Sequence, residues 1–130
     1  MGPRQRKEML LVPEAGYDEV RANNLTGPFF LTQRVARAMI AMLEEGTIQE
    51  SKIVKICSVS AAASSSEPAE DCLSNGGVSM MTRLWADRLS RHGMLVYELR
   101  PGIVLTDMTV AVKAKYDRLL LEQGLALTRR

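Results

Sequence analysis

Three polar residues at fixed spacing form the strongest candidate for chemistry in this 130-residue chain. Ser58 follows a short β-branched segment, Asp71 comes 13 residues later, and Asn75 lies four residues beyond Asp71. A free aspartate has a pKa of about 3.9, so keeping Asp71 protonated at pH 7 would cost roughly 4 kcal/mol. We therefore expect Asp71 to be an anion that donates no proton, unless deep burial raises its pKa by about 3–5 units.

The elements that must position these residues alternate between helix and strand. Near-helical spacing of apolar residues predicts a helix over 17–46, with a kink or a restart at Gly27-Pro28. Residues 52–58 and 95–100 have the pattern of strands, a helical stripe ending at Gly93 lies between them, and a last helix is expected over about 109–122. This order predicts β-α-β crossovers and a parallel sheet.

Two loops follow the predicted strands. Residues 60–71 are rich in serine and alanine, and Pro101-Gly102 follows the second strand. In a doubly wound fold, ligands bind beside the carboxyl ends of the strands. The sequence therefore predicts one crevice that both loops flank.

The composition excludes several classes of protein. Apolar residues make up 46% and charged residues 25%, as in an ordinary globular domain. A net charge of +2 and only 5% aromatic residues argue against a nucleic-acid partner. Cys57, Cys72 and the single His92 cannot supply a zinc-type ligand set, so we expect no metal and two reduced thiols. Without a long apolar run or a signal-peptide pattern, we expect a cytoplasmic protein with no membrane partner.

Several segments, taken together, resemble the short-chain dehydrogenase/reductase family, and its 3-oxoacyl-carrier-protein reductase-like branch is nearest. The resemblance covers about residues 17–124 and is carried by Asn24–Gln33, Ile56–Ser58, Asp71–Ala86 and Arg100–Met108. It implies an α/β fold, a partial Rossmann-like doubly wound parallel sheet. We expect one truncated domain over 1–130, with an irregular lead-in over 1–16 and a tail over 125–130.

The same resemblance implies roles for individual residues. Asn24 matches the family's catalytic asparagine, and Ser58 matches its catalytic serine. The family's proton-donating tyrosine and its lysine fall at Asp71 and Asn75, and the flanking pattern continues without a gap. Asp71 and Asn75 therefore replace the family's tyrosine and lysine, and no shift of the alignment restores either residue.

The cofactor that the resemblance implies is NAD(P). The residues that would line its nicotinamide pocket are Pro101, Gly102, Ile103 and Thr106. Each retained residue also has a structural interpretation: Asn24 could bridge backbone in a kinked helix, and Ser58 could cap a strand end. Only their joint order and spacing favour the functional interpretation.

Parts of the family pattern are missing from this sequence. It has no glycine-rich turn of the kind that binds a cofactor pyrophosphate, and it lacks the family's asparagine-rich strand end and its last strand. We expect a truncated, degenerate relative without carbonyl-reducing activity on its own. Two alternatives stay open: another polypeptide completes an active oxidoreductase, or the chain is a non-catalytic oligomerisation module.

The resemblance also implies a subunit interface built from the helices that match residues 17–45 and 76–91. We expect a homo-oligomer or an assembly with a related reductase subunit. Burial in the chain's own core is an equal alternative for the side chains that would make this contact. They are Phe29, Phe30, Met39, Met42, Met81 and Trp85.

Overall fold

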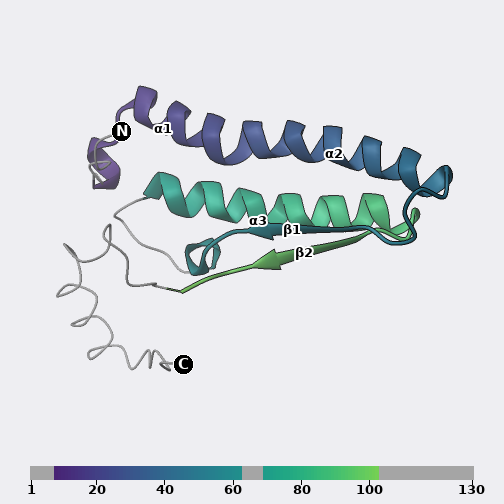
Figure 1. The fold of residues 1–130 in the computed structure, drawn as a ribbon. Coiled ribbons are helices and arrows are strands. Elements are labelled where there is room, and N and C mark those ends of the chain that lie inside the picture. The colour runs from purple at the N-terminus through teal and green to yellow at the C-terminus, as the bar shows by residue number, and fades with distance from the viewer. Residues whose placement is uncertain (1–7, 63–68, 103–130) are drawn as a thin grey trace. The chain divides into compact units, whose positions relative to one another are not determined.

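The structure, a computed structural model, describes residues 8–62 and 69–102, and the described residues up to Pro101 lie within one compact unit. Figure 1 shows long helices above a short two-stranded sheet. The elements in chain order are the 3-10 turn η1 (Met9–Leu11), α1 (Glu14–Arg21), the π-helical segment η2 (Ala22–Thr26), α2 (Gly27–Glu44), β1 (Lys52–Ile56), the 3-10 turn η3 (Val59–Ala61), α3 (Ala69–Ser90) and β2 (Leu95–Leu99).

The two strands pair in parallel, as the alternation of elements predicted. Lys52 pairs with Leu95 and Ile56 pairs with Leu99, and α3 connects the strands (Figure 1). The described part is therefore a β-α-β unit preceded by a long helical segment, which confirms the expected partial Rossmann-like α/β fold.

The core lies between the helices and one face of the sheet. Ala36 of α2, Leu89 of α3 and Met94 are all at most 2% exposed. Ile53 and Val96 extend this core from the strands. The opposite face of the sheet is about half exposed, and its apolar residues are Val54, Ile56, Leu95, Tyr97 and Leu99.

The helix over 17–46 differs from the expectation in how it passes Pro28. No restart occurs, because η2 widens the helical turn so that the Gly27 N–H donates to the Ala22 carbonyl. Pro28 then lies in the first turn of α2, where its missing N–H costs little. α1 begins at Glu14, so the irregular lead-in is shorter than expected.

The loop after β1 is also shorter than expected, because α3 begins at Ala69 and already contains Asp71. Gly46 and Gly93 follow α2 and α3 with positive φ angles of 74° and 69°, a conformation that favours glycine. The predicted helix over 109–122 lies outside the described residues. No helix in the described ranges is long and apolar enough to cross a membrane.

Two adjacent glycines in α3 provide a matched test of how closely this helix approaches η2. A Cβ at Gly77 would lie 2.7 Å from Leu25 Cδ2, whereas a Cβ at Gly76 would come no closer than 4.0 Å to the Ala61 carbonyl. We expect Gly76→Ala to raise the free energy of unfolding by about 0.5–1 kcal/mol through helix propensity. Gly77→Ala should give no gain or a loss, because Leu25 must move.

Urea denaturation followed by circular dichroism measures both variants. A gain at Gly77→Ala equal to the gain at Gly76→Ala would contradict the close packing of Leu25.

Candidate functional site

Asn75, at the position of the family lysine, connects α3 to the loop after β1. Its Nδ2 donates to the Asp71 carbonyl oxygen at 2.8 Å and to Ser60 Oγ at 3.2 Å. The Cys57 thiol donates to the Asn75 carbonyl oxygen at 3.3 Å. The Asn75 side chain therefore supplies a neutral amide that holds neighbouring backbone and hydroxyl groups.

Asp71 lies in the first turn of α3, where a negative charge is favourable. Its carbonyl oxygen also accepts a hydrogen bond from Ser74 Oγ at 3.0 Å. Asp71 and Asn75 are thus adjacent on one side of α3, as their spacing of four residues requires.

Asn24 lies in η2 and approaches α3 from the other side. Its Nδ2 donates to Ser74 Oγ at 3.0 Å, although the two residues are 50 positions apart in the chain. Ser74 is 3% exposed, so this bond is largely shielded from water. The fold therefore brings three of the predicted site residues, Asn24, Asp71 and Asn75, to the same part of α3.

Replacing Asn24 tests this connection. Asn24→Ala should lower the free energy of unfolding by about 0.5–1.5 kcal/mol, because one shielded hydrogen bond is lost while Ser74 Oγ keeps its bond to Asp71. The matched control is Asn23→Ala, since Asn23 lies beside it. Equal losses for both variants in urea denaturation would show that the bond to Ser74 adds nothing.

Ser58 lies directly after β1, at the N-terminus of η3. Its Oγ accepts a hydrogen bond from the Ser60 N–H at 3.2 Å and so caps η3. The Val59 N–H donates to the Pro101 carbonyl at 3.2 Å, which places the ends of β1 and β2 together as predicted. Gly102 is exposed, whereas Ile103 and Thr106 lie outside the described residues.

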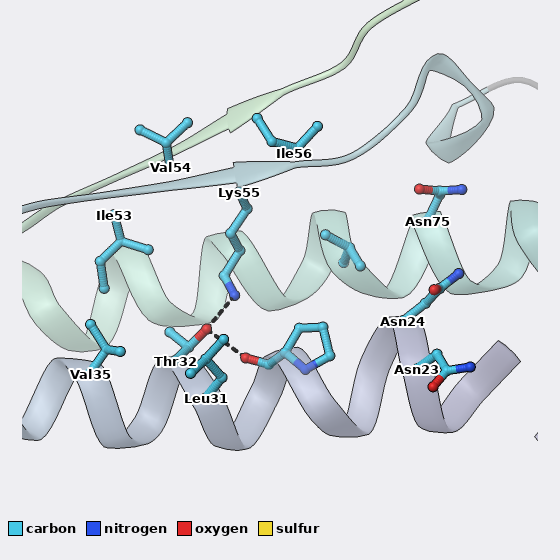
Figure 2. Close-up of a pocket in the computed structure, with 12 residues that line it drawn as sticks. Asn23, Asn24, Leu31, Thr32, Val35, Ile53, Val54, Lys55, Ile56 and Asn75 are labelled. Atoms are coloured by element: carbon cyan, nitrogen blue, oxygen red, sulfur yellow. Dashed lines mark hydrogen bonds between the residues drawn. The ribbon is translucent and has the colours of Figure 1, made fainter. Parts of the chain in front are cut away.

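A cavity of about 450 Å³ lies beside β1 and α2. Figure 2 shows Asn24 and Asn75 toward one end of it and Lys55 pointing from β1 toward α2. Its lining consists of Asn23, Asn24, Pro28, Leu31, Thr32, Val35, Ile53, Val54, Lys55, Ile56, Asn75 and Val78.

Lys55 is the functional candidate that the sequence interpretation missed. It is only 8% exposed, and its Nζ donates to Thr32 Oγ1 at 2.7 Å and to Met81 Sδ at 3.4 Å (Figure 2 shows the first of these bonds). No carboxylate pairs with it within the described part of the chain. Burial therefore lowers the pKa of this ammonium group. Strand alternation places Lys55 on the same face as the core residue Ile53, and this signal could have identified it.

A second polar cluster lies where β2 ends. Arg100 Nε donates to Glu98 Oε1 at 2.9 Å, and Ser79 Oγ donates to Glu98 Oε2 at 3.2 Å. The Arg100 guanidinium lowers the pKa of the Glu98 carboxyl, and burial raises the pKa of the nearby Cys57 thiol. No disulfide joins Cys57 to Cys72 in the described part of the chain. The described residues contain no group of three side chains that could hold a metal.

Comparison with known proteins identifies the family. A family model described as short chain dehydrogenase matches residues 2–117. This chain belongs to the short-chain dehydrogenase family. The chain also superimposes with a TM-score of 0.82 and 38% identity on a 3-oxoacyl-[acyl-carrier protein] reductase from Brucella melitensis in complex with NAD. That match covers 96% of this chain and 48% of the reductase.

Two further relatives support this membership. The chain is 30% identical over 111 residues to 5-keto-D-gluconate 5-reductase from Escherichia coli, covering 85% of this chain and 41% of that protein. A gluconate 5-dehydrogenase from Burkholderia cenocepacia, in complex with NADP and tartrate, matches with a TM-score of 0.79 and 27% identity over 94% of this chain and 46% of that one. The chain thus spans less than half the length of these short-chain dehydrogenase relatives.

Proposed function

We propose that this short-chain dehydrogenase relative does not reduce carbonyl groups on its own. The observation that carries the proposal is the Asn75 amide, which lies at the family's lysine position and bonds to Asp71 and Ser60. It brings no positive charge to the site. The buried ammonium of Lys55 bonds to Thr32 of α2 instead.

The chemistry of carbonyl reduction explains why this matters. A proton must reach the carbonyl oxygen as hydride reaches the carbon, and a donor with a pKa near the working pH does this best. In the family, a tyrosine phenol beside a lysine ammonium fills that role. A free aspartate ionises well below pH 7 and an amide is neutral, so we expect neither Asp71 nor Asn75 to supply the proton or to stabilise a phenolate.

The direct test is a rate measurement on the purified chain. With NADPH and a 3-oxoacyl thioester, we expect turnover at least about 10²-fold below that of a complete 3-oxoacyl reductase assayed in parallel, because general acid catalysis contributes about that much or more. A rate within tenfold of the complete enzyme would overturn the proposal.

A second candidate function is an active NAD(P)-dependent oxidoreductase that another polypeptide completes. Two features favour it: the chain covers less than half of its relatives, and β1 has an open edge within the described residues. We infer a cytoplasmic location both for the chain on its own and for the chain completed by another polypeptide. Affinity purification of the tagged chain from its native cells should yield NAD(P) together with a second chain that carries a glycine-rich turn. Recovery of the chain without either would contradict it.

A third candidate is a non-catalytic oligomerisation module. The helices retain exposed apolar side chains that could meet a second copy or a related reductase subunit: Phe30, Leu31, Met80 and Leu84, which are 52–64% exposed. Of the residues predicted for this contact from the sequence, Phe29, Phe30 and Met42 are 37–59% exposed, whereas Met81 and Trp85 contribute to the chain's own packing. Met81 is 6% exposed, and the Phe29 ring lies 5.5 Å from the Trp85 ring.

Oligomer formation predicts a mass at least twice that of the chain in light scattering. Leu84→Glu should then shift the protein toward monomer. Monomer at all concentrations, together with no mixed species after addition of an intact homologue, would remove this candidate.

A further inference from the structure

The cavity described above runs along the outer edge of β1. Four consecutive residues of the strand line it, from Ile53 to Ile56. Successive side chains of a strand point to opposite faces of the sheet, and Figure 2 shows Ile53 and Lys55 pointing toward the helices while Val54 and Ile56 point away. One cavity can contact side chains on both faces of the sheet only where it lies along the edge of the strand.

The backbone at this edge is available for pairing. On the side facing β2, the Ser51 carbonyl accepts from the Leu95 N–H at 3.2 Å, and the Cys57 N–H donates to the Leu99 carbonyl at 2.8 Å. Along a parallel strand, successive residues direct their backbone N–H and C=O groups to alternate edges. The groups of Val54 and Ile56 therefore point to the outer edge, away from β2. No strand among residues 8–62 and 69–102 pairs there. Such an edge is a template for an additional strand.

The cavity forms a groove along β1, and the opposite wall of this groove consists of one face of α2 together with α3. Pro28, Leu31 and Val35 follow one another at helical spacing, and Val78 of α3 adds a further apolar side chain. This wall suits the apolar side chains of an extended segment. The Lys55 ammonium is the exception, since it is buried here beside a hydroxyl and a thioether and has no carboxylate partner in the described ranges.

We propose that this groove binds an extended strand from a second polypeptide, and that a carboxylate of this strand pairs with Lys55 Nζ. Main-chain hydrogen bonds to β1 provide affinity, and pockets for alternate side chains provide specificity. Charge complementarity identifies the strand as apolar with one acidic residue. The inference rests on the proposed completion of the fold by another chain, and it deepens that proposal by naming where the other chain docks.

The probe is an eight-residue, fluorescein-labelled peptide in which valine and isoleucine alternate around a central glutamate. A second peptide has glutamine in place of the glutamate. Binding to the whole chain is measured by fluorescence anisotropy for the wild type, for Lys55→Met and for Lys52→Met. Lys52 is a matched control, because it lies on the same strand but is exposed and paired with Glu50.

We expect the wild type and Lys52→Met to bind the glutamate peptide about tenfold or more tightly than the glutamine peptide. Lys55→Met should bind both peptides equally. Comparing ratios keeps the test valid even if Lys55→Met changes the affinity for both peptides. A glutamate preference that persists in Lys55→Met, or the absence of any preference in the wild type, would overturn the proposal.

A further pair of peptides tests the strand pairing itself. N-methylation at alternate residues removes the donors on one edge of the peptide, and only one of the two N-methylated forms should lose binding, by at least about tenfold. Equal binding of both forms would overturn strand addition. A stable dimer of this chain that excludes the peptide would also overturn it. These peptides test binding at the groove alone, so a failure here is distinct from a failure of the proposed completion, which co-purification of a second chain tests.

Discussion

Leu89→Ala should lower the free energy of unfolding by about 2–5 kcal/mol, the range for removing a large side chain from a packed core. Leu89 is 1% exposed and packs with Ala36 and Met94 at the centre of the core. In so short a unit the loss is a large fraction of the total stability, so much of the variant should be unfolded at 37 °C.

The matched control is Leu73→Ala, because Leu73 lies on the same helix but is 59% exposed. Thermal and urea denaturation followed by circular dichroism compare the two variants. We expect a change of no more than about 0.5 kcal/mol for Leu73→Ala. A similar loss for both would show that the core does not lie where the helices meet the sheet.

Lys55→Met should stabilise the isolated chain by about 1–3 kcal/mol at pH 7, because it removes a buried ammonium group that has no carboxylate partner within the described residues. Thr32 Oγ1 still donates to the Pro28 carbonyl at 2.6 Å, so the substitution leaves no orphaned hydroxyl. Urea denaturation measures the gain. A loss of stability would show that the Lys55 charge is well solvated.

The same residue predicts how stability depends on pH. Burial lowers the pKa of Lys55 in the folded chain below the ordinary value of 10.5. Between the two pKa values the unfolded chain binds more protons, so the free energy of unfolding should rise as pH rises through that window. The rise should vanish in Lys55→Met and persist in Lys52→Met, since the neighbouring Glu50 raises the pKa of Lys52. A rise of equal slope in all three proteins would contradict this assignment.

Much of the fold was predictable because local patterns and global packing agree. Ile53, which lies in a predicted strand, meets Ala36 and Leu89, which lie in predicted helical segments, in one core. The passage through Pro28 was not predictable, because whether a helix restarts or widens depends on the partner it packs against. Here Leu25, which belongs to the π-helical segment, packs closely against Gly77 of α3.

For the candidate site, the sequence predicted Asn24, Ser58, Asp71 and Asn75 but not their partners. It placed Asp71 at the end of a loop, whereas the structure places Asp71 in α3, one turn before Asn75. Nothing in the spacing indicated that Asn24 bonds to Ser74 across 50 positions of the chain. Strand alternation indicated the inward face for Lys55, but its burial and its bond to Thr32 became visible only with the structure, because they depend on how α2 packs.

The central claim is that the site near Ser58 lacks the proton donor and the cation that carbonyl reduction requires. Its most direct measurement is a single-turnover experiment in which excess homogeneous chain is mixed with NADPH deuterated at the transferable position and a 3-oxoacyl thioester. The product is then analysed by mass spectrometry. We predict no hydroxyacyl product above the level of a reaction without protein. Stoichiometric formation of a deuterated hydroxyacyl product would contradict the claim.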